Sequence, residues 1–183
     1  ILDNKLFEET ISSQNVFSGK VINITLDEVK LCNGNHSTRE VVNHSGGVCV
    51  LPIVNNGLEV ILVKQFRYPY KKVILEAPAG KLEHGEHPLD TAKRELREET
   101  GAIAENYISL GHIYPSPGYS AEIIYIYTCN VTSFGNIDLD EDEFLNIERI
   151  PFDKALEMVM DGSIHDAKTQ IAILKYSILN KKD

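Results

Sequence analysis

The feature that most constrains this chain is a predicted helix within residues 80–101 that carries three glutamates on one face. Glu95, Glu98 and Glu99 are spaced i, i+3 and i+4, which places them within about 100° of arc on a helix. Like charges at this spacing destabilise a helix by roughly 0.2–0.5 kcal/mol per pair. The nearest cation is Arg94, four residues before Glu98 in the weaker orientation for a pair, so we expect the three glutamates to lack charge partners. Clustered carboxylates of this kind typically bind a divalent cation such as Mg²⁺, which takes oxygen ligands and acts on phosphate groups. The alternative is a solvated helix face.

The flanking residues predict where this helix begins and ends. Pro88 suits a first-turn position, because it lacks only an N–H that would be unpaired there. Gly101 is a natural C-cap residue, so we expect the helix to end at Thr100. The helix would pack through a narrow apolar stripe at i, i+3 and i+7, formed by Leu89, Ala92 and Leu96.

Composition narrows the class of protein. The chain has 183 residues, 43% hydrophobic and 25% charged, which is ordinary for a soluble globular protein with a full core. No apolar run approaches the length of a transmembrane helix, and the first residues do not resemble a secretory signal, so we expect no membrane partner. The formal net charge of −9 argues against a nucleic-acid partner. Three widely spaced cysteines predict reduced thiols in a cytoplasmic protein.

We expect two regions, an N-terminal β-strand subdomain over residues 1–45 and a larger domain over 46–183. Residues 16–31 alternate loosely as one strand, an Asn-Gly turn signal follows at 32–35, and 37–44 return as a second strand. A two-stranded unit cannot bury its own apolar face, so we expect this subdomain to form a dimer.

The larger region mixes strands with helices, and the segment 132–142 between two of its strands is a polar, acidic loop. Strands are expected over 48–54, 58–66, 73–77, 107–114, 122–131 and 143–150, and helices over 88–100, 152–160 and 166–179. Strands around one central helix, with two helices at the end, predict a mixed sheet packed between helices, in the α/β (α+β) class.

The glutamate helix also carries a known family pattern. Eight residues occupy fixed positions of G-x5-E-x7-R-E-U-x-E-E-x-G-U, where U is bulky aliphatic: Gly80, Glu86, Arg94, Glu95, Leu96, Glu98, Glu99 and Gly101. The segment resembles the Nudix box, with one departure at the last aliphatic position, where Ala102 is smaller than usual and Ile103 follows. The resemblance implies the Nudix α/β/α sandwich with a mixed sheet, here with an N-terminal β appendage, and pyrophosphohydrolase chemistry.

Three further segments resemble the ADP-ribose pyrophosphatase branch of the Nudix hydrolases. Residues 65–68 (QFRY) match its Q-x-R segment, and residues 76–80 (EAPAG) match its E-x-P-A-G segment. Pro117, followed by Gly118, lies fifteen residues after Ala102, where this branch carries a diagnostic proline. The resemblance implies hydrolysis of ADP-ribose to AMP and ribose 5-phosphate. A broader nucleoside-diphosphate-sugar pyrophosphatase, acting on GDP-mannose, other ADP-sugars or dinucleotides, and a non-catalytic ADP-ribose sensor remain alternatives.

The same resemblance implies roles for the residues of the box. The metal ligands would be the Ala79 backbone carbonyl, Glu95 and Glu99, with Glu98 contributing directly or through water. The ion would be Mg²⁺ or Mn²⁺, which neutralises charge on a pyrophosphate and polarises a P–O bond. Arg94 would hold the box glutamates in orientation.

The general base and the substrate contacts would lie outside the box. The base would come from the acidic stretch 140–143 (DEDE), in which Glu141 and Glu143 are both candidates and a solvated acidic loop is the alternative. The substrate-binding candidates, together with Pro117 and Gly118, are Arg67, Arg39, Glu76 and Phe17. Arginine offers a planar fork suited to phosphate, whereas Glu76 is a candidate either for substrate contact or for pairing with Arg67. The resemblance further implies a homodimer with exchanged N-terminal strands around a small nucleotide-sugar substrate.

Overall fold

The computed structural model describes residues 5–139, 141 and 143–180, and the chain divides into two compact units. The first, here called the N-terminal unit, combines Ile1–Gly46 with Tyr114–Ile123. The second, the main unit, combines Gly47–Ile113 with Ile124–Asp183. The segment 114–123 groups with residues much earlier in the sequence: the Val42 N–H donates to the Tyr119 carbonyl at 2.8 Å, and the Ala121 N–H donates to the Val42 carbonyl at 2.9 Å.

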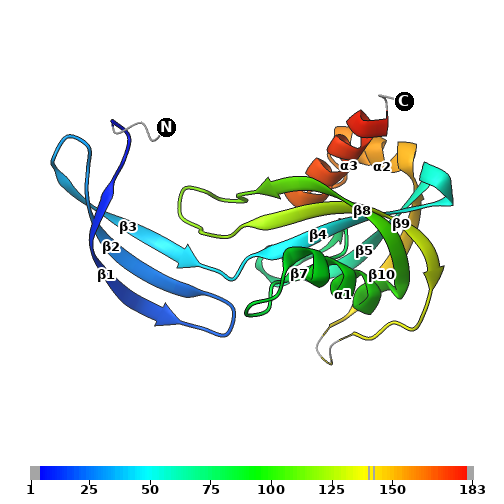
Figure 1. Cartoon of the computed structure of the whole chain (residues 1–183), viewed down its shortest axis with the longest axis horizontal. Helices are drawn as coiled ribbons and strands as arrows, with labels where there is room; N and C mark the ends of the chain where they lie inside the picture. Colours follow the sequence, from blue (N-terminus) through cyan, green and yellow to red (C-terminus); the bar gives the residue numbers. More distant parts are fainter. Residues whose placement is uncertain (1–4, 140, 142, 181–183) are drawn as a thin grey trace. The chain divides into compact units, whose positions relative to one another are not determined.

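The N-terminal unit is a three-stranded antiparallel sheet, of which β1 (Glu9–Ser18), β2 (Asn23–Lys30) and β3 (His36–Asn43) are the strands within the described residues (Figure 1). The prediction of a single strand over residues 16–31 was wrong. The chain turns between β1 and β2, where the Gly19 N–H donates to the Ile22 carbonyl at 2.9 Å. That turn carries no Asn-Gly or Asp-Gly pair, the strongest short-range hairpin signal, and its Ser18-Gly19 pair is a weaker turn signal.

The main unit is built on a mixed sheet that has seven strands over the residues described above. Its strands are β4 (Gly47–Val54), β5 (Glu59–Arg67), β6 (Lys72–Glu76), β7 (Ala79–Lys81), β8 (Ala102–Ile113), β9 (Ile124–Phe134) and β10 (Leu145–Pro151). The order is β10-β5-β4-β9-β8, with β6 beside β5 and β7 beside β4. The β4–β9 pair is parallel and the other pairs are antiparallel.

Three helices in the described part of the chain cover the two faces of this sheet: α1 (Pro88–Thr100), α2 (Phe152–Met160) and α3 (Ala167–Asn180) (Figure 1). Side chains of β4 alternate between the two faces. Cys49 and Leu51 pack in a core with residues of α2 and α3, whereas Val48 and Val50 pack with α1. The expected α/β/α sandwich with a mixed sheet is therefore confirmed. None of the helices described here is long and apolar enough to cross a membrane.

Element ends depart from the prediction where tertiary pairing extends a strand. β8 begins at Ala102 rather than at residue 107, because its first residues pair with the end of β9. The short strand β7 was not predicted, since three residues carry no alternation and form a strand only by pairing with β4. It matters for the site because it contains the first glycine of the box.

Candidate active site

Helix α1 begins and ends as its cap residues predicted. The His87 ring nitrogen Nδ1 accepts a hydrogen bond from the Leu89 N–H at 3.3 Å. Gly101 adopts a left-handed conformation with φ 67°, and its N–H donates to the Arg97 carbonyl at 2.8 Å. Ala92 and Leu96 are fully buried in the core beneath the helix. The apolar stripe therefore fixes the helix on the sheet and turns its glutamate face toward β7.

The expectation that the three glutamates lack charge partners was wrong, because Arg94 joins two of them. Its Nη1 donates to Glu95 Oε1 at 2.8 Å and to Glu98 Oε2 at 2.9 Å. Its Nε and Nη2 donate to the two carboxylate oxygens of Glu86 at 3.1 and 3.0 Å. The hydrogen bond from Arg94 lowers the pKa of Glu86 to about 2. Helix spacing alone did not indicate this contact, because Glu86 lies in the preceding loop.

Glu99 is the glutamate without a cation. Its side chain is 2% exposed, and within the described residues it forms no ion pair of its own. Its Oε2 accepts a hydrogen bond from the Ala79 N–H at 3.1 Å. Burial raises its pKa well above the ordinary value, and the negative charges of Glu143 and Glu95 raise it further. Burial also raises the pKa of Glu95, against the opposing effect of Arg94. These carboxylates are thus held in a place where their charge is unfavourable.

The first glycine of the box allows Glu95 to reach the backbone of β7. A Cβ atom on Gly80 would lie 1.8 Å from the carboxyl carbon of Glu95, well inside any permitted contact. A side chain at this position would displace the Glu95 carboxylate from where it lies. The backbone of Ala79 and Gly80 and the side chains of Glu95 and Glu99 therefore meet at one point, between β7 and α1.

The two candidates for the general base are placed differently. Glu143 accepts a hydrogen bond from Gln65 Nε2 at 3.3 Å and is close enough to raise the pKa values of Glu95 and Glu99. Glu141 is exposed. The other two acidic residues of the stretch, at positions 140 and 142, lie outside the described residues. The structure thus brings Glu143, and not Glu141, beside the glutamates of the box.

The loop that carries these residues is fastened to the end of α1. The Gly135 N–H donates to the Gly101 carbonyl at 2.7 Å, and the Asp138 N–H donates to the Glu98 carbonyl at 3.0 Å. A Cβ on Gly101 would lie 2.5 Å from the Gly135 carbonyl oxygen. The last glycine of the box therefore both caps the helix and permits close approach of the acidic loop.

Of the two alternatives for Glu76, the structure shows pairing with Arg67. The guanidinium of Arg67 binds the carboxylate of Glu76 through Nε and Nη2, at 2.7 and 2.9 Å. Glu76 is 2% exposed and Arg67 is half-buried. Lys168 Nζ also contacts Glu76, at 2.5 Å. Lys168 was not found from the sequence, because it lies 92 residues away and belongs to no motif recognised there.

Four predicted substrate-binding residues belong to the N-terminal unit instead. Arg39, on β3, binds the carboxylate of Glu8 at 2.6 Å. Phe17, on β1, is 51% exposed. Pro117 and Gly118 lie in the segment 114–123 of the same unit. The other predicted site residues, apart from the exposed Glu141, lie in the main unit: Ala79 on β7, Arg94, Glu95, Glu98 and Glu99 on α1, Arg67 and Glu76 at the ends of β5 and β6, and Glu143 just before β10.

The carboxylate oxygens of Glu95 and Glu99 beside β7 are of the type that a hard divalent cation prefers. A cation would also offset the buried negative charge of Glu99. In the described part of the chain, however, no three His, Cys, Asp or Glu side chains converge as a ready-made metal site. Arg94 instead holds Glu95 and Glu98. The glutamates are chemically suited to bind a divalent metal ion, but Arg94 already binds the carboxylates of Glu95 and Glu98 and would compete with the ion for them.

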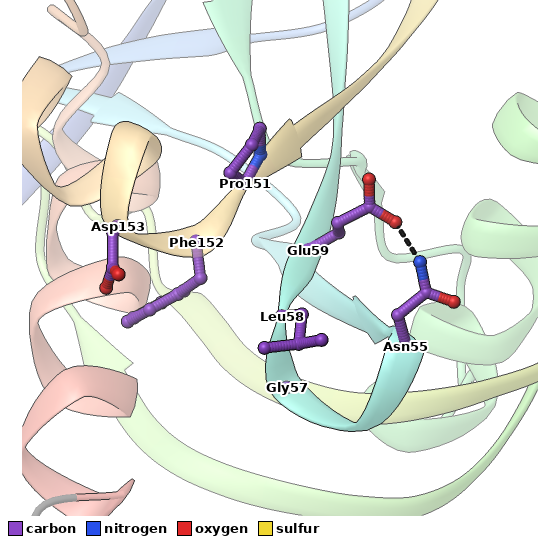
Figure 2. Close-up of a pocket in the computed structure, with 7 residues that line it drawn as sticks. All are labelled: Asn55, Gly57, Leu58, Glu59, Pro151, Phe152 and Asp153. Atoms are coloured by element: carbon purple, nitrogen blue, oxygen red, sulfur yellow. Dashed lines mark hydrogen bonds between the residues drawn. The ribbon is translucent and has the colours of Figure 1, made fainter.

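A pocket of about 500 Å³ lies beyond the end of β4 that is farther from the glutamates of the box; its lining residues are drawn in Figure 2. Its lining residues are Asn55, Gly57, Leu58, Glu59, Pro151, Phe152 and Asp153. Val48 pairs with Gly80 near the start of β4, whereas the pocket begins directly after Val54, the last residue of that strand. At about 3.3 Å per strand residue, roughly 20 Å separates the pocket from the glutamates. It is not part of the candidate active site.

A sheet held between helices, with Glu95 and Glu99 of α1 beside the backbone of β7, is an arrangement suited to phosphate chemistry assisted by a divalent cation. Residues 43–169 match the NUDIX domain family, and the chain belongs to this family. It is a Nudix hydrolase, a class that generally depends on divalent metal ions.

Similar proteins cover nearly the whole chain. The chain is 44% identical over 170 residues to the "ADP-ribose pyrophosphatase" of Bacillus subtilis (strain 168), covering 92% of this chain and 91% of that protein. It is 44% identical over 172 residues to the "Methanol dehydrogenase activator" of Bacillus methanolicus, covering 92% of both. The solved structure described as "Crystal structure of ADP compounds hydrolase" superimposes with a TM-score of 0.84 over 97% of this chain and 96% of that one. Its 20% identity supports the fold alone.

Proposed function

We propose that this Nudix hydrolase cleaves the pyrophosphate bond of ADP-ribose, giving AMP and ribose 5-phosphate, and that it does so with Mg²⁺. The observation that carries the proposal is the buried carboxylate of Glu99, whose pKa is raised further by Glu143 and Glu95 and which forms no ion pair with any side chain in the described part of the chain. A protein retains such an arrangement at a cost in stability, and a bound cation is the simplest compensation. The substrate is supported by the relatives named ADP-ribose pyrophosphatase.

Glu95, Glu99 and the Ala79 carbonyl would hold the metal ion, with Glu98 binding directly or through water. When bound, the ion would neutralise charge on the pyrophosphate and polarise a P–O bond. Arg94 would keep Glu95 and Glu98 oriented, as residues behind metal ligands commonly do. Arg94 binds Glu86 through Nε and Nη2, whereas it binds Glu95 and Glu98 through Nη1. Glu86 can therefore hold the guanidinium in place while the contacts with Glu95 and Glu98 adjust to a metal ion.

Glu143 is the general base in this proposal. It would take a proton from a water molecule whose oxygen attacks one phosphorus, while the bond from that phosphorus to the bridging oxygen breaks. Gln65 Nε2 donates a hydrogen bond to Glu143 Oε1 at 3.3 Å, which helps to orient this side chain. Glu143 is favoured over Glu141 by its closeness to Glu95 and Glu99.

Arg67 would bind the pyrophosphate. Glu76 engages its Nε and Nη2, so the fork is held in one orientation with Nη1 directed elsewhere. A guanidinium that is already fixed loses less conformational entropy when it binds phosphate. Its charge also lies within electrostatic reach of Glu99, which is consistent with a ligand that spans both.

The N-terminal unit would complete the site in a homodimer with exchanged strands, with Arg39 and Phe17 contacting the nucleotide beside Pro117 and Gly118. Every residue of β1 is exposed in the single chain, including Ile11, Val16 and Phe17, so this strand has an apolar surface that a partner could cover. Sedimentation equilibrium tests the dimer, and a monomer at micromolar concentration would contradict it.

The free thiols of the three cysteines of the chain support a cytoplasmic location.

Chromatographic product analysis tests the activity. The protein is incubated with ADP-ribose, GDP-mannose, ADP-glucose and NADH, each with Mg²⁺ and with EDTA. We expect AMP from ADP-ribose, abolished by EDTA. Faster hydrolysis of another compound would transfer the assignment to the broader nucleotide-sugar class. Tight binding of ADP-ribose without turnover would identify a sensor.

The matched pair Glu143→Gln and Glu141→Gln tests the base. We expect Glu143→Gln to lower turnover roughly 100-fold or more, within the range typical of general bases. Glu141→Gln removes the same charge two residues away and should leave turnover within about twofold, because that side chain is exposed. Equal losses from both variants, or a larger loss from Glu141→Gln, would contradict the assignment.

A further inference from the structure

Lys168 lies in the first turn of α3 and is the least exposed lysine that forms an ion pair in the described part of the chain. Its side chain is 12% exposed, and its Nζ contacts Glu76 Oε2 at 2.5 Å and Asp166 Oδ1 at 2.9 Å. Glu76 in turn binds Arg67 through both carboxylate oxygens. Two cations, Arg67 and Lys168, and two carboxylates, Glu76 and Asp166, thus form one continuous network.

The network is attached to the strand that leads into the box. Asp166 Oδ2 accepts hydrogen bonds from the Thr169 N–H at 2.9 Å and from its hydroxyl at 2.5 Å. The same hydroxyl oxygen accepts a hydrogen bond from the Ala77 N–H at 2.7 Å. The first turn of α3 is therefore joined to residues 76 and 77 by both side-chain charge and backbone hydrogen bonding. Lys168 has a fixed position relative to Glu76.

Charge balance explains what this lysine contributes. Burial by itself would lower the pKa of Lys168, but Asp166 and Glu76 outweigh that effect and raise it, so the ammonium group stays charged. Glu76 is almost fully buried, and without Lys168 its negative charge would be paired with Arg67 alone. With Lys168 present, the network of two cations and two carboxylates has no net charge. Without it, an anionic ligand approaching Arg67 would meet a net negative group.

We propose that Lys168 is a positioning residue for substrate binding, which neutralises Glu76 and thereby leaves the positive charge of Arg67 available to the pyrophosphate of the substrate. The inference rests on the proposed function, in which Arg67 binds that pyrophosphate. Lys168 itself does not contact the substrate in this account. Its role is to set the charge and the orientation of the group that does.

Equilibrium binding tests the inference without turnover. ADP-ribose and inorganic pyrophosphate are each titrated by calorimetry in EDTA into the full chain and its variants. We expect Lys168→Met to weaken binding of both probes about tenfold, as expected for loss of one nearby charge at intermediate dielectric. Lys168→Arg retains the charge and should bind within about threefold of the unmodified protein. In the hydrolysis assay, Lys168→Met should raise KM by a similar factor and leave kcat within about twofold.

Two further variants separate charge from folding. Lys175→Met removes a lysine from the same helix, seven residues later, whose Nζ donates to the Leu110 carbonyl at 2.5 Å rather than to a carboxylate. It carries the same change in net charge and should bind both probes normally. The double variant Asp166→Asn/Lys168→Met makes the network neutral again and should recover most of the lost affinity. Circular dichroism checks that each variant is folded.

The outcomes distinguish this inference from the proposed function. If the unmodified protein does not hydrolyse ADP-ribose but its binding of pyrophosphate depends on Lys168, the proposed function is wrong and the inference stands. If folded Lys168→Met binds both probes as tightly as the unmodified protein, the inference is wrong whether or not hydrolysis occurs. Failure of the unmodified protein to bind either probe would also overturn it, because Arg67 would then not be an anion site.

Discussion

Replacing Glu99 by Gln should stabilise the metal-free protein and nearly abolish its activity. The carboxylate is 2% exposed, lies near Glu95 and Glu143, and accepts one hydrogen bond, from the Ala79 N–H. Gln has the same shape and keeps that acceptor, but removes the buried charge. Relief of an uncompensated buried charge is worth about 2–3 kcal/mol, from which about 1 kcal/mol is lost to the newly buried amide N–H groups. The net gain of about 1–2 kcal/mol raises the melting temperature by roughly 3–6 °C for a chain of this size.

The activity should change in the opposite direction. Loss of a metal ligand removes about 3 kcal/mol of transition-state stabilisation, which corresponds to roughly a 100-fold lower rate. Mg²⁺ at 100 times its Kd should stabilise the unmodified protein by about 2.7 kcal/mol and Glu99→Gln far less.

Thermal unfolding in EDTA and in Mg²⁺, together with the ADP-ribose assay, measures all three quantities. Glu157→Gln serves as the matched control, because Glu157 is 67% exposed and pairs only with Lys154 at 3.0 Å among the ion pairs described. It should change stability by less than about 0.5 kcal/mol. A less stable metal-free Glu99→Gln would show that the buried charge is compensated by something other than a metal ion. Near-normal turnover would show that the carboxylate is not a ligand.

Two other predictions follow from the same cluster. Because burial raises the pKa values of Glu95 and Glu99, the folded state binds more protons than the unfolded state, and stability in EDTA should fall as pH rises above the ordinary carboxyl range near 4.5. Melting curves from about pH 5 to pH 9 check this, and the stabilisation by Mg²⁺ should grow over the same range; a flat profile in EDTA would contradict it. Arg94→Lys keeps the charge but cannot bridge Glu86, Glu95 and Glu98 together. This variant should weaken the apparent affinity of the enzyme for Mg²⁺ roughly 10–100-fold, measured as activity in a Mg²⁺ titration, with unchanged helix content. An unaltered titration would show that Arg94 does not orient the ligands.

The sequence predicted best what is decided locally. The ends of α1 follow from Pro88 and Gly101, and its buried face follows from apolar spacing, so the helix was found to the residue. The turn between β1 and β2 was missed because its local signal, the Ser18-Gly19 pair, is weaker than an Asn-Gly or Asp-Gly pair. The contact of Arg94 with Glu86 was missed for a different reason. It depends on how a loop folds back onto the helix, which spacing along the helix cannot express.

The charges that act on the site come from residues far apart in the sequence, so the sequence motifs predicted only some of the residues of the site. Glu143 acts on Glu99 from a loop that follows β9, and Lys168 acts on Glu76 from α3. Glu76 and Glu99 are equally buried, at 2% exposure, yet of these two carboxylates only Glu76 forms ion pairs with side chains of residues that the structure describes. The difference is informative because both cost free energy to bury. The free-energy cost of burying Glu76 is offset by the cationic side chains that bind it, which suits a carboxylate that holds an arginine in place. The cost of burying Glu99 is not offset by an ion pair among the described residues, which suits a carboxylate that binds a metal ion from solution.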